Sequence, residues 1–507
     1  MLILGDKPLT IHDVVCVARE RKRVALSDSA RERIEKSRAW VDNILQSEQV
    51  VYGISTGFGE FAKVSIPPDD RALLQKNLIL SHCTGVGVPL PEDVVRAVML
   101  LRANSLAMGY SGIRLSTLEA LLALLNHNIY PAVPEKGSVG ASGDLAPLSH
   151  MAAVLLGEGS VICDGSIVPA RVALEEAGLP PITLAGKEGL ALINGTQVMT
   201  AIGALACYDG ELLSKAADIA AALSLEALQG TCAAFDPRVS AVRPHSGQIE
   251  SAKNMCLLTK GSEIIAAHES CDKVQDAYSL RCIPQVHGAS REAFRRVRET
   301  LDIEMNAVTD NPLVMPETGE IISAGNFHGQ PVALVMDYFK IALSELGNIS
   351  ERRVNRLVDP HLSDLPAFLT AFGGVNSGLM ITQYTAASLV SENKVLAHPA
   401  SVDSIPTSAN QEDHVSMGTI AARQAREILE NVKSVLAIEC LAAIQGIDFL
   451  KPKRPGRGTG AAYDYLRSIV PHLEEDRVLY PDIFAICSTI TDESLIKIVE
   501  TALGTSL

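Results

Sequence analysis

The chain has 507 residues, a net charge of −15 and 47% hydrophobic residues. Its length exceeds what one hydrophobic core usually serves, so we expect two or three lobes or one large helical body. Charged residues are 20% of the chain, which excludes wholesale disorder, and the negative charge repels phosphate backbones and argues against nucleic acid as a partner.

The cysteines and the apolar segments bear on the cellular compartment. The ten cysteines are scattered without a C-x-x-C pair, a pattern typical of reduced thiols in the cytoplasm. The segment 1–6 has a very short apolar run and no basic residues before it, so no signal peptide is expected. Asp218 and Glu226 interrupt the most apolar run, 216–228, which favours a core helix over a membrane span.

Taken in chain order, the predicted elements are mostly helices. The first 200 residues favour short helices, rich in Gly and Pro, with a surface hairpin near 159–163. Apolar residues at helical spacing predict three long helices, 198–228 closed by Gly230, 331–358 ended by Asp359-Pro360, and 416–446 with Gly446 as the residue after the last turn. The second of these would be about 40 Å long.

These patterns predict a mainly α fold, an elongated bundle of long helices with a smaller, loop-rich N-terminal region. The expected division is 1–195, 196–450 and a helical tail 451–507 within one integrated fold, and the basic run Lys451–Gly460 is expected to be a solvated loop. Strands do not alternate with helices, so a doubly wound sheet is disfavoured.

Several common catalytic motifs are missing from the sequence. It has no H-E-x-x-H zinc motif and no P-loop, and the segment 140–144 misses the G-x-S-x-G nucleophile elbow by one position. The glycine-rich signature of the fumarase and aspartase lyases, which are also helical bundles, is absent as well. With no clustered metal ligands, no obligatory metal is expected.

The segment 137–150 reads G-S-V-G-A-S-G-D-L-A-P-L-S-H and contains the tripeptide Ala141-Ser142-Gly143. One interpretation is a flexible glycine loop capped by Asp144 at a helix start. In a tight bend, however, the Gly143 nitrogen can attack the Ala141 carbonyl carbon, since glycine has no side chain to obstruct it. Loss of two waters, the second taking the Ser142 hydroxyl, gives a methylidene-imidazolone, an electrophile that no ordinary side chain supplies.

Around this segment the chain resembles the aromatic amino acid ammonia-lyase family, over nearly its whole length. The motifs that carry the resemblance are 52–59 (YGISTGFG), 77–82 (NLILSH), 137–150, 194–197 (NGTQ), 274–282 (VQDAYSLRC), 325–328 (GNFH) and 410–418 (NQEDHVSMG). The resemblance implies non-oxidative deamination by the protein-derived methylidene-imidazolone, without pyridoxal phosphate. It also implies a homotetramer whose active sites are shared between subunits.

The resemblance also implies roles for single residues. Tyr52 matches the base that removes the β-proton, and its pKa near 10 would have to fall by about three units, which needs about 4 kcal/mol. Arg281 matches the anchor of the substrate carboxylate, for which a two-pronged guanidinium is suited. Asn194 and Tyr278 match groups that hold the electrophile's carbonyl and the substrate amine. The positions that line the pocket in the family are matched by Gln275 and Phe327.

Two residues predict the choice of substrate. His82 falls where the family sets ring selectivity, and Glu412 falls where phenylalanine-type relatives are expected to carry a neutral amide. A carboxylate can accept from an imidazole N–H, whereas an apolar ring would leave it buried and unpaired at a cost of about 1–3 kcal/mol or more. The pair therefore favours L-histidine over phenylalanine.

Three functions remain open from the sequence. The first is deamination of histidine to trans-urocanate and ammonia. The second keeps the chemistry but changes the substrate or outcome, as in a tyrosine or phenylalanine ammonia-lyase or an aminomutase. The third is a helical scaffold in which Ala141-Ser142-Gly143 never cyclises.

Overall fold

The structure is a computed structural model that describes residues 1–47, 51, 53–54, 56–57, 64–163, 165–268 and 274–507. Its residues group by their contacts into two compact units, each assembled from three separated stretches of chain. Unit 1 comprises 1–208, 298–337 and 399–423, and unit 2 comprises 209–297, 338–398 and 424–507. The division 1–195, 196–450 and 451–507 follows the sequence instead and stays a prediction.

Unit 1 is built from short helices and short strands. Its helices are α1 (Ile11–Ala18), α2 (Asp28–Gln46), α3 (Arg71–His82), α4 (Glu92–Ala107), α5 (Leu115–Asn126), α6 (Leu145–Leu155), α7 (Ala170–Glu176) and α8 (Glu188–Ile193), with 3₁₀ turns at Pro68–Asp70 and Ser408–Asn410. Its strands are β1 (Leu2–Leu4), β2 (Val24–Leu26), β3 (Val86–Pro89), β4 (Tyr130–Pro131), β5 (Pro134–Lys136), β6 (Ser160–Cys163), β7 (Ser166–Pro169), β8 (Leu313–Val314) and β9 (Ile321–Ile322).

Four long helices each contribute residues to both units. They are α9 (Gln197–Ala227), α14 (Ile283–Glu304), α15 (Gln330–Val358) and α18 (Gly418–Asp448). The remaining helices of unit 2 are α10 (Pro237–Ala241), α11 (Ser246–Leu258), α12 (Glu263–Ala266), α13 (Tyr278–Arg281), α16 (Pro360–Ser363), α17 (Met380–Leu396), α19 (Arg457–Ile469), α20 (Tyr480–Thr491) and α21 (Ser494–Leu503), with 3₁₀ turns at Ala233–Phe235 and Ala367–Leu369.

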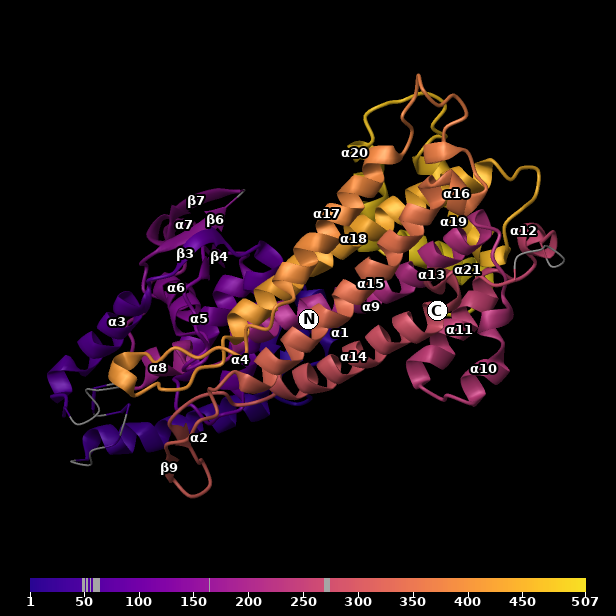
Figure 1. Ribbon diagram of the computed structural model, residues 1–507. Coiled ribbons are helices and arrows are strands. Elements are labelled where there is room, and N and C mark those ends of the chain that lie inside the picture. The colour runs from indigo at the N-terminus through magenta and orange to yellow at the C-terminus, as the bar shows by residue number, and fades with distance from the viewer. Residues whose placement is uncertain (48–50, 52, 55, 58–63, 164, 269–273) are drawn as a thin grey trace. The chain divides into compact units, whose positions relative to one another are not determined.

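The sheets of unit 1 are small and lie at its edges. β1 pairs with β2 in parallel, while β3–β5 and β8–β9 are antiparallel pairs. The hairpin expected near 159–163 is confirmed as β6 and β7, in register Val161↔Val168, and β4 adds a third strand beside β6. Figure 1 shows α7 beside this hairpin. The mainly α prediction is confirmed.

Helix α4 forms the centre of unit 1, because every residue from Val94 to Ala107 is buried. It packs against α1, α2 and α5, while α3, α6 and α8 pack against one another. Burial on all faces explains why this helix shows no clear polar stripe in the sequence. It also means that its arginines Arg96 and Arg102 must find all their hydrogen-bond partners inside the protein.

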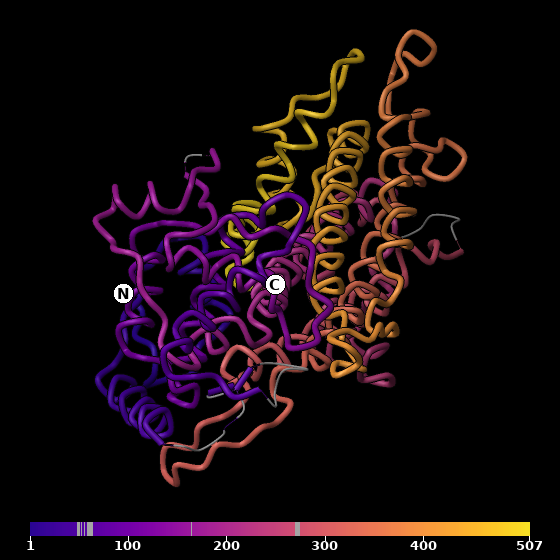
Figure 2. Tube along the Cα trace, turned by 90° about the vertical axis from the view of Figure 1, so that its left-hand side faces the viewer, coloured from indigo at the N-terminus to yellow at the C-terminus, as the bar shows by residue number. Residues whose placement is uncertain are grey.

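Unit 2 is a bundle in which parts of α15, α17 and α18 pack together, side by side in Figures 1 and 2. Their contact includes Val354, Ala386 and Val435. A buried ion pair crosses this core, with both carboxylate oxygens of Glu439 facing Arg353, one of them 2.8 Å from Nη2. Such long neighbouring helices explain the periodic apolar runs of the sequence.

Two details of the predicted elements are wrong. Gly446 lies inside α18, which continues to Asp448, because the glycine lets α9 approach: an added Cβ would lie 3.1 Å from the Cβ of Ala227. The run Lys451–Gly460 is not all loop, since α19 begins at Arg457. Gly456 and Gly458 pack closely on the backbone of Thr259 and Leu258, so tertiary contacts hold these glycines in or beside a helix.

Candidate active site

The loop that carries Ala141-Ser142-Gly143 is bent tightly in unit 1. Gly143 has φ +71°, and a Cβ there would lie 2.0 Å from the Gly195 carbonyl oxygen, so only glycine fits. Gly140, also at φ +71°, would place a Cβ 2.1 Å from Ser416 Oγ. The spacing G-A-S-G is therefore required by close packing on both sides of the loop.

The loop is clamped between two other segments by backbone hydrogen bonds. The Gly195 N–H donates to the Ser142 carbonyl oxygen at 3.2 Å, and the Asp144 N–H donates to the Gly195 carbonyl oxygen at 2.7 Å. On the other side, Met417 N–H donates to the Val139 carbonyl at 2.9 Å. The junction between α8 and α9 and the start of α18 thus hold the tripeptide from opposite sides.

Asp144 holds the end of the loop through its buried carboxylate. The alternative interpretation, in which Asp144 caps the helix that follows it, does not hold: its side chain makes no cap with α6 and instead accepts from the N–H groups of Val198 and Met199, both at 2.9 Å, at the start of α9. Ser138 and Thr419 also donate hydroxyls to it. Burial raises its pKa to about 6, against these hydrogen bonds.

A cavity of about 300 Å³ opens over the tripeptide. Its lining residues are Ser81, His82, Thr84, Gly137, Ser138, Val139, Ala141, Ser142, Gly143, Leu145, Ala146, Thr407 and Glu412. Glu412 Oε1 accepts from Ser142 Oγ at 3.2 Å. The structure therefore brings together the tripeptide and both residues that were predicted to select the substrate.

His82 and Glu412 provide the polar groups opposite the tripeptide. His82 is the last residue of α3 and is half-buried, and its ring Nδ1 lies 3.1 Å from Ser81 Oγ. Burial lowers the pKa of His82, and the charge of Glu412 partly counteracts that effect. A neutral imidazole and a carboxylate thus face one small cavity, which suits a ligand with both N–H donors and acceptors.

A short irregular loop fixes Glu412. Thr407 Oγ1 donates to Glu412 Oε2 at 2.6 Å, and the two residues also exchange backbone hydrogen bonds of 3.0 and 3.3 Å. Between them Ser408, Ala409 and Asn410 have φ of 51°, 53° and 67°. Three successive left-handed residues are unfavourable, so this strained turn persists because its surroundings impose it.

Asn194 follows α8 and is buried beside the loop. Its Nδ2 donates to Asp310 Oδ1 at 3.3 Å and to the Asn311 carbonyl at 3.1 Å. Lys187 in turn pairs with Asp310 Oδ2 at 2.8 Å. The Oδ1 atom of Asn194 is buried without a partner within the described chain, and Asn194 is not among the residues that line the cavity.

The other predicted site residues fall in three places. Phe327 is half-buried in a turn of unit 1 before α15 and is not among the residues that line the cavity. Gln275, Tyr278 and Arg281 belong to unit 2, where Gln275 is exposed and Tyr278 is 71% exposed. The Arg281 guanidinium stacks 4.6 Å from the centre of the Tyr278 ring. Tyr52 lies outside the described residues.

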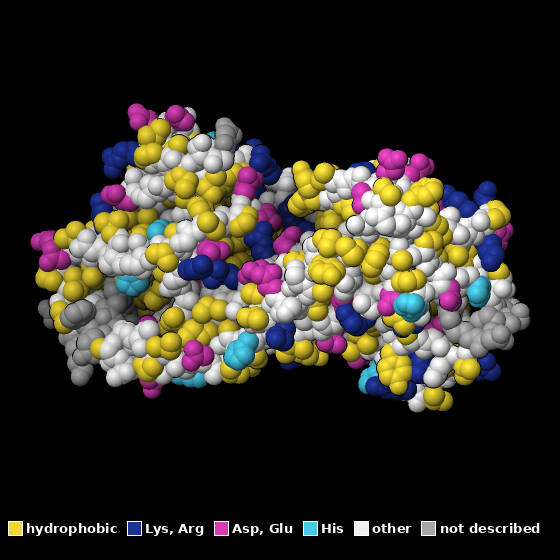
Figure 3. All heavy atoms as spheres, turned by 45° about the horizontal axis from the view of Figure 1, so that its top comes forward, with side chains coloured by type: hydrophobic (Ala, Val, Ile, Leu, Met, Phe, Trp, Pro, Cys, Tyr) yellow, Lys and Arg dark blue, Asp and Glu magenta, His cyan; other side chains and the backbone are white. Residues whose placement is uncertain are grey.

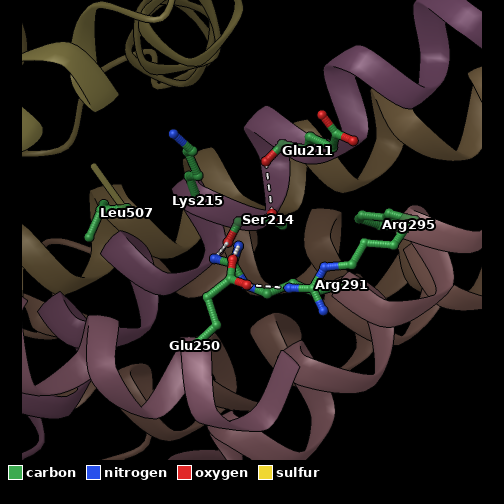
Figure 4. A pocket seen from close by; sticks show the side chains of 8 residues that line it. Glu211, Ser214, Lys215, Glu250, Arg291, Arg295 and Leu507 are labelled. Carbon is green, nitrogen blue, oxygen red and sulfur yellow. Dashed lines mark hydrogen bonds and ion pairs between the residues drawn. The ribbon is translucent and has the colours of Figure 1, made fainter. Parts of the chain in front are cut away.

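Unit 2 contains a second hollow, of about 210 Å³, lined by the side chains in Figure 4. Its charges neutralise one another: Arg291 pairs with Glu250 at 2.7 Å and with the buried Asp218 at 2.6 Å, and Lys215 pairs with Glu500 at 2.7 Å. These pairs give the hollow a structural explanation, and we do not assign it a ligand.

The described residues contain neither a cluster of metal ligands nor a helix that could span a membrane. Within the ranges given above, no three His, Cys, Asp or Glu residues are arranged to hold a metal ion. In the same residues, no helix is both long and apolar enough to span a bilayer.

Comparison with known proteins identifies the family. A sequence model described as aromatic amino acid lyase matches residues 9–468. The chain is 57% identical to the histidine ammonia-lyase of Alkaliphilus oremlandii, over 99% of both chains, and 58% identical to that of Caldanaerobacter subterraneus subsp. tengcongensis, over 96% of this chain and 95% of that one. The chain therefore belongs to the aromatic amino acid lyase family, as its motifs indicate.

Solved structures agree with this assignment. The histidine ammonia-lyase of Trypanosoma cruzi superposes with a TM-score of 0.92 at 45% identity, covering 99% of this chain and 95% of that chain. The tyrosine aminomutase of Streptomyces globisporus superposes with 0.94 at 38% identity, covering 100% and 99%. Since enzymes of different outcome share the fold so closely, the choice of substrate must be argued from the site.

Sequence reasoning missed several residues of this site. Thr407, Arg102 and Asp310 hold Glu412, the Asn194 backbone and the Asn194 side chain, respectively. Thr407 lies three residues before the quoted motif 410–418, so its proximity to Glu412 was the one available signal. Nothing in the sequence distinguished Arg102 or Asp310 from ordinary charged residues.

Proposed function

We propose that this protein deaminates L-histidine to trans-urocanate and ammonia, with an electrophile formed from Ala141-Ser142-Gly143. The observation that carries the proposal is the 3.2 Å contact between Glu412 and Ser142 Oγ in a cavity that His82 also lines. A carboxylate at that point suits the N–H groups of an imidazole ring and not an apolar ring. The names of the relatives given above point to the same reaction.

The tripeptide fits a self-formed methylidene-imidazolone. Gly140 before it and Gly143 within it permit the tight bend, and Gly195 N–H reaches the Ser142 carbonyl oxygen that would remain as the ring carbonyl. When formed, this group supplies a carbon that accepts the substrate amine and so makes ammonia a better leaving group. Ala141, Ser142 and Gly143 supply its atoms, and Asp144 anchors the end of the loop.

The residues of the cavity bind and orient the substrate. Glu412 accepts from an imidazole N–H, and His82 offers the second polar contact to the ring. Thr407 keeps Glu412 in place through the 2.6 Å hydrogen bond. Asn194 does not line this cavity but lies beside the loop, where it is proposed to hold the electrophile's carbonyl or the substrate amine, while Asp310 and the Asn311 carbonyl fix its amide orientation.

Tyr52 and Arg281 complete the proposed machinery. Tyr52 is the base that takes the β-proton. The described neighbour Gly53 packs near Leu190 and Pro312, because an added Cβ would lie 3.2 Å from a side-chain carbon of each. Leu190 lies four residues before Asn194, and Pro312 follows Asn311, whose carbonyl accepts from the Asn194 side chain.

Arg281 is the carboxylate anchor, and Tyr278 stands with it. The two form one stacked unit, and the Nε of Arg281 is buried without a partner among the residues described. Because the family resemblance implies active sites shared between subunits, we propose that a second copy of the chain brings them to the tripeptide. Gln275 and Phe327 are proposed to line the assembled pocket.

A homotetramer with shared sites follows from the same reasoning. Unit 2 exposes large apolar side chains on α15, α17 and α20; they include Tyr338, Ile341, Ile381, Tyr384, Val395, Tyr480 and Phe484. On the face shown in Figure 3, hydrophobic side chains are exposed among charged ones. Sedimentation of the wild type and of Tyr384→Glu tests this: the variant should dissociate, and a monomeric wild type would contradict the shared site.

The remaining features of the proposal concern cofactors and compartment. The reaction needs neither pyridoxal phosphate nor an obligatory metal, because the protein supplies its own electrophile. A cytoplasmic location suits the buried thiols of Cys16, Cys440 and Cys487, which form no disulfide.

One assay tests the proposed function directly. Purified protein is mixed with L-histidine, L-phenylalanine or L-tyrosine, and the ultraviolet absorbance of the unsaturated acid is followed. We expect urocanate from histidine and little product from the other two. Comparable turnover of phenylalanine would indicate a general aromatic ammonia-lyase, a β-amino acid product would indicate an aminomutase, and no turnover with an unmodified mass would indicate a scaffold.

A further inference from the structure

Arg102 is a fully buried cation in α4 with an unusual set of partners. Its Nη1 donates to the Asn194 carbonyl oxygen at 2.6 Å and to Gln197 Oε1 at 3.0 Å, and its Nη2 donates to Ser105 Oγ at 3.1 Å. Among the described residues none of its hydrogen-bond partners is a carboxylate, since the nearby Asp310 pairs with Lys187. Burying a guanidinium without a carboxylate partner costs free energy, so the presence of Arg102 at this position needs an explanation.

The guanidinium remains charged at neutral pH. Burial lowers its pKa to about 10, and the charge of Asp310 opposes part of that effect. A full positive charge therefore lies 2.6 Å from one particular peptide group, the one that joins Asn194 to Gly195.

This peptide group is hydrogen-bonded at both ends. Its oxygen accepts from Arg102, and its N–H donates to the Ser142 carbonyl oxygen at 3.2 Å. A cation at the oxygen draws electron density from the amide and makes the N–H a stronger donor, because linked hydrogen bonds polarise one another. The charge of Arg102 is in this way transmitted to the tripeptide without contact.

The Ser142 carbonyl oxygen is where such a donor matters. In the mature group this carbonyl is conjugated with the methylidene carbon, so any nucleophile that adds there sends electron density toward the oxygen. Donors aimed at an oxygen that gains negative charge are among the strongest contributions to catalysis. We propose that Arg102 is a positioning residue that raises the reactivity of the electrophile through the Asn194–Gly195 peptide group.

Gly195 supports this assignment independently. It has φ +148°, and a Cβ there would lie 2.8 Å from Arg102 Nη1 and 2.4 Å from Gln197 Oε1. The absence of a side chain is thus what lets the guanidinium reach the peptide oxygen. The inference rests on the proposed function, because it assumes that Ala141-Ser142-Gly143 matures.

The test compares Arg102→Met and Arg102→Lys with a matched control. Arg96 is another buried arginine of α4, and it donates to the carbonyls of Val17 and Leu125, 2.9 and 3.2 Å away. Arg96→Met therefore removes an equally buried charge that has no link to the tripeptide. Intact mass spectrometry first establishes whether each protein is two waters lighter than its sequence.

The decisive quantity is the rate at which cyanide adds to each mature protein, read from the mass increase with time. Cyanide has neither a ring nor a carboxylate, so its rate reports the electrophile and not substrate binding. We expect Arg102→Met to react about tenfold more slowly than the wild type, by analogy with the loss of an oxyanion donor, Arg102→Lys to be intermediate, and Arg96→Met to be unchanged. With histidine, kcat should fall more than KM rises.

Equal cyanide rates in Arg102→Met and the wild type would overturn the proposal. So would failure of both Arg102 variants to mature while Arg96→Met matures, since Arg102 would then serve to build the loop. An unmodified mass in active wild-type protein would instead overturn the proposed function, and the two failures are therefore distinguishable.

Discussion

Replacement of Glu412 by glutamine tests the substrate assignment most directly. Glutamine has nearly the same shape, and Thr407 Oγ1 can accept from its amide as readily as it donates to the carboxylate across the present 2.6 Å. The strained turn between the two residues should therefore survive. What is lost is the negative charge that faces the ring of the substrate.

The size of the effect follows from the exchange of one hydrogen bond. A charge-assisted contact is worth about 1.5–3 kcal/mol, which corresponds to roughly ten- to a hundredfold in kcat/KM. Glu412 is half-buried at a cavity of about 300 Å³, so bulk water screens this contact only in part. We expect Glu412→Gln to lose activity toward histidine within that range while the mass of the mature protein is unchanged.

The assay measures kcat/KM for histidine and for phenylalanine, each from the absorbance of its unsaturated product. Glu412→Gln should lower the ratio of the two, whereas Arg281→Lys should weaken both substrates alike, because it acts on their shared carboxylate. Asp413→Asn, a change in the exposed neighbour of Glu412, is the control and should leave the ratio intact. If Glu412→Gln and Arg281→Lys shift the ratio equally, Glu412 does not contact the ring, and the histidine assignment falls.

The remaining predictions concern maturation, cofactors, pH and stability. Ser142→Ala should fold with the wild-type circular dichroism but should not lose the second water, because alanine has no hydroxyl, and it should retain almost no activity. Exhaustive chelation should leave most activity, and activity restored only by an added metal would contradict the self-formed electrophile. The pKa of Asp144 is raised to about 6, so the folded state binds more protons than the unfolded state. The contribution of Asp144 to stability is therefore present below about pH 4 and is lost, on the order of 2–3 kcal/mol, as the pH rises through 6. The melting temperature of the wild type relative to Asp144→Asn should accordingly be higher at pH 4.5 than at pH 7. Arg353→Met leaves Glu439 charged and buried, which costs about 3–5 kcal/mol, so the melting temperature of a chain of this length should fall by roughly 3–5 °C, and a shift below about 1 °C would show that the pair is dispensable.

The long helices show how far periodicity carries a prediction. The predicted range 198–228 differs from α9 by one residue at each end, and 331–358 differs from α15 by one residue at its start, because apolar spacing and the Asp359-Pro360 stop are local signals. Gly446 and the run 457–460 were misjudged because glycine is a helix breaker only on average. There, close packing against Ala227 and Leu258 offsets its low propensity.

The chemistry of the site could be predicted from the sequence because the proposed electrophile forms from consecutive residues. The five-membered ring closes between consecutive residues such as Ala141-Ser142-Gly143, so the proposed electrophile could be inferred from the chain alone, and the motif 410–418 pointed to Glu412 as its companion. His82 and Glu412 are 330 residues apart along the chain, yet both line one cavity in the fold, and their role in selecting the substrate stays a prediction.

Only the tertiary structure identifies the residues that act by holding other residues in place. Arg102, Asp144 and Thr407 owe their roles to hydrogen bonds with residues that folding brings near, such as the Asn194 carbonyl and the start of α9. No spacing rule links these positions, because a hydrogen bond depends on distances of about 3 Å in space and not on separation along the chain. The sequence by itself therefore determined which residues are proposed to form the electrophile, and the packing of distant segments determined which residues hold them in place and polarise them.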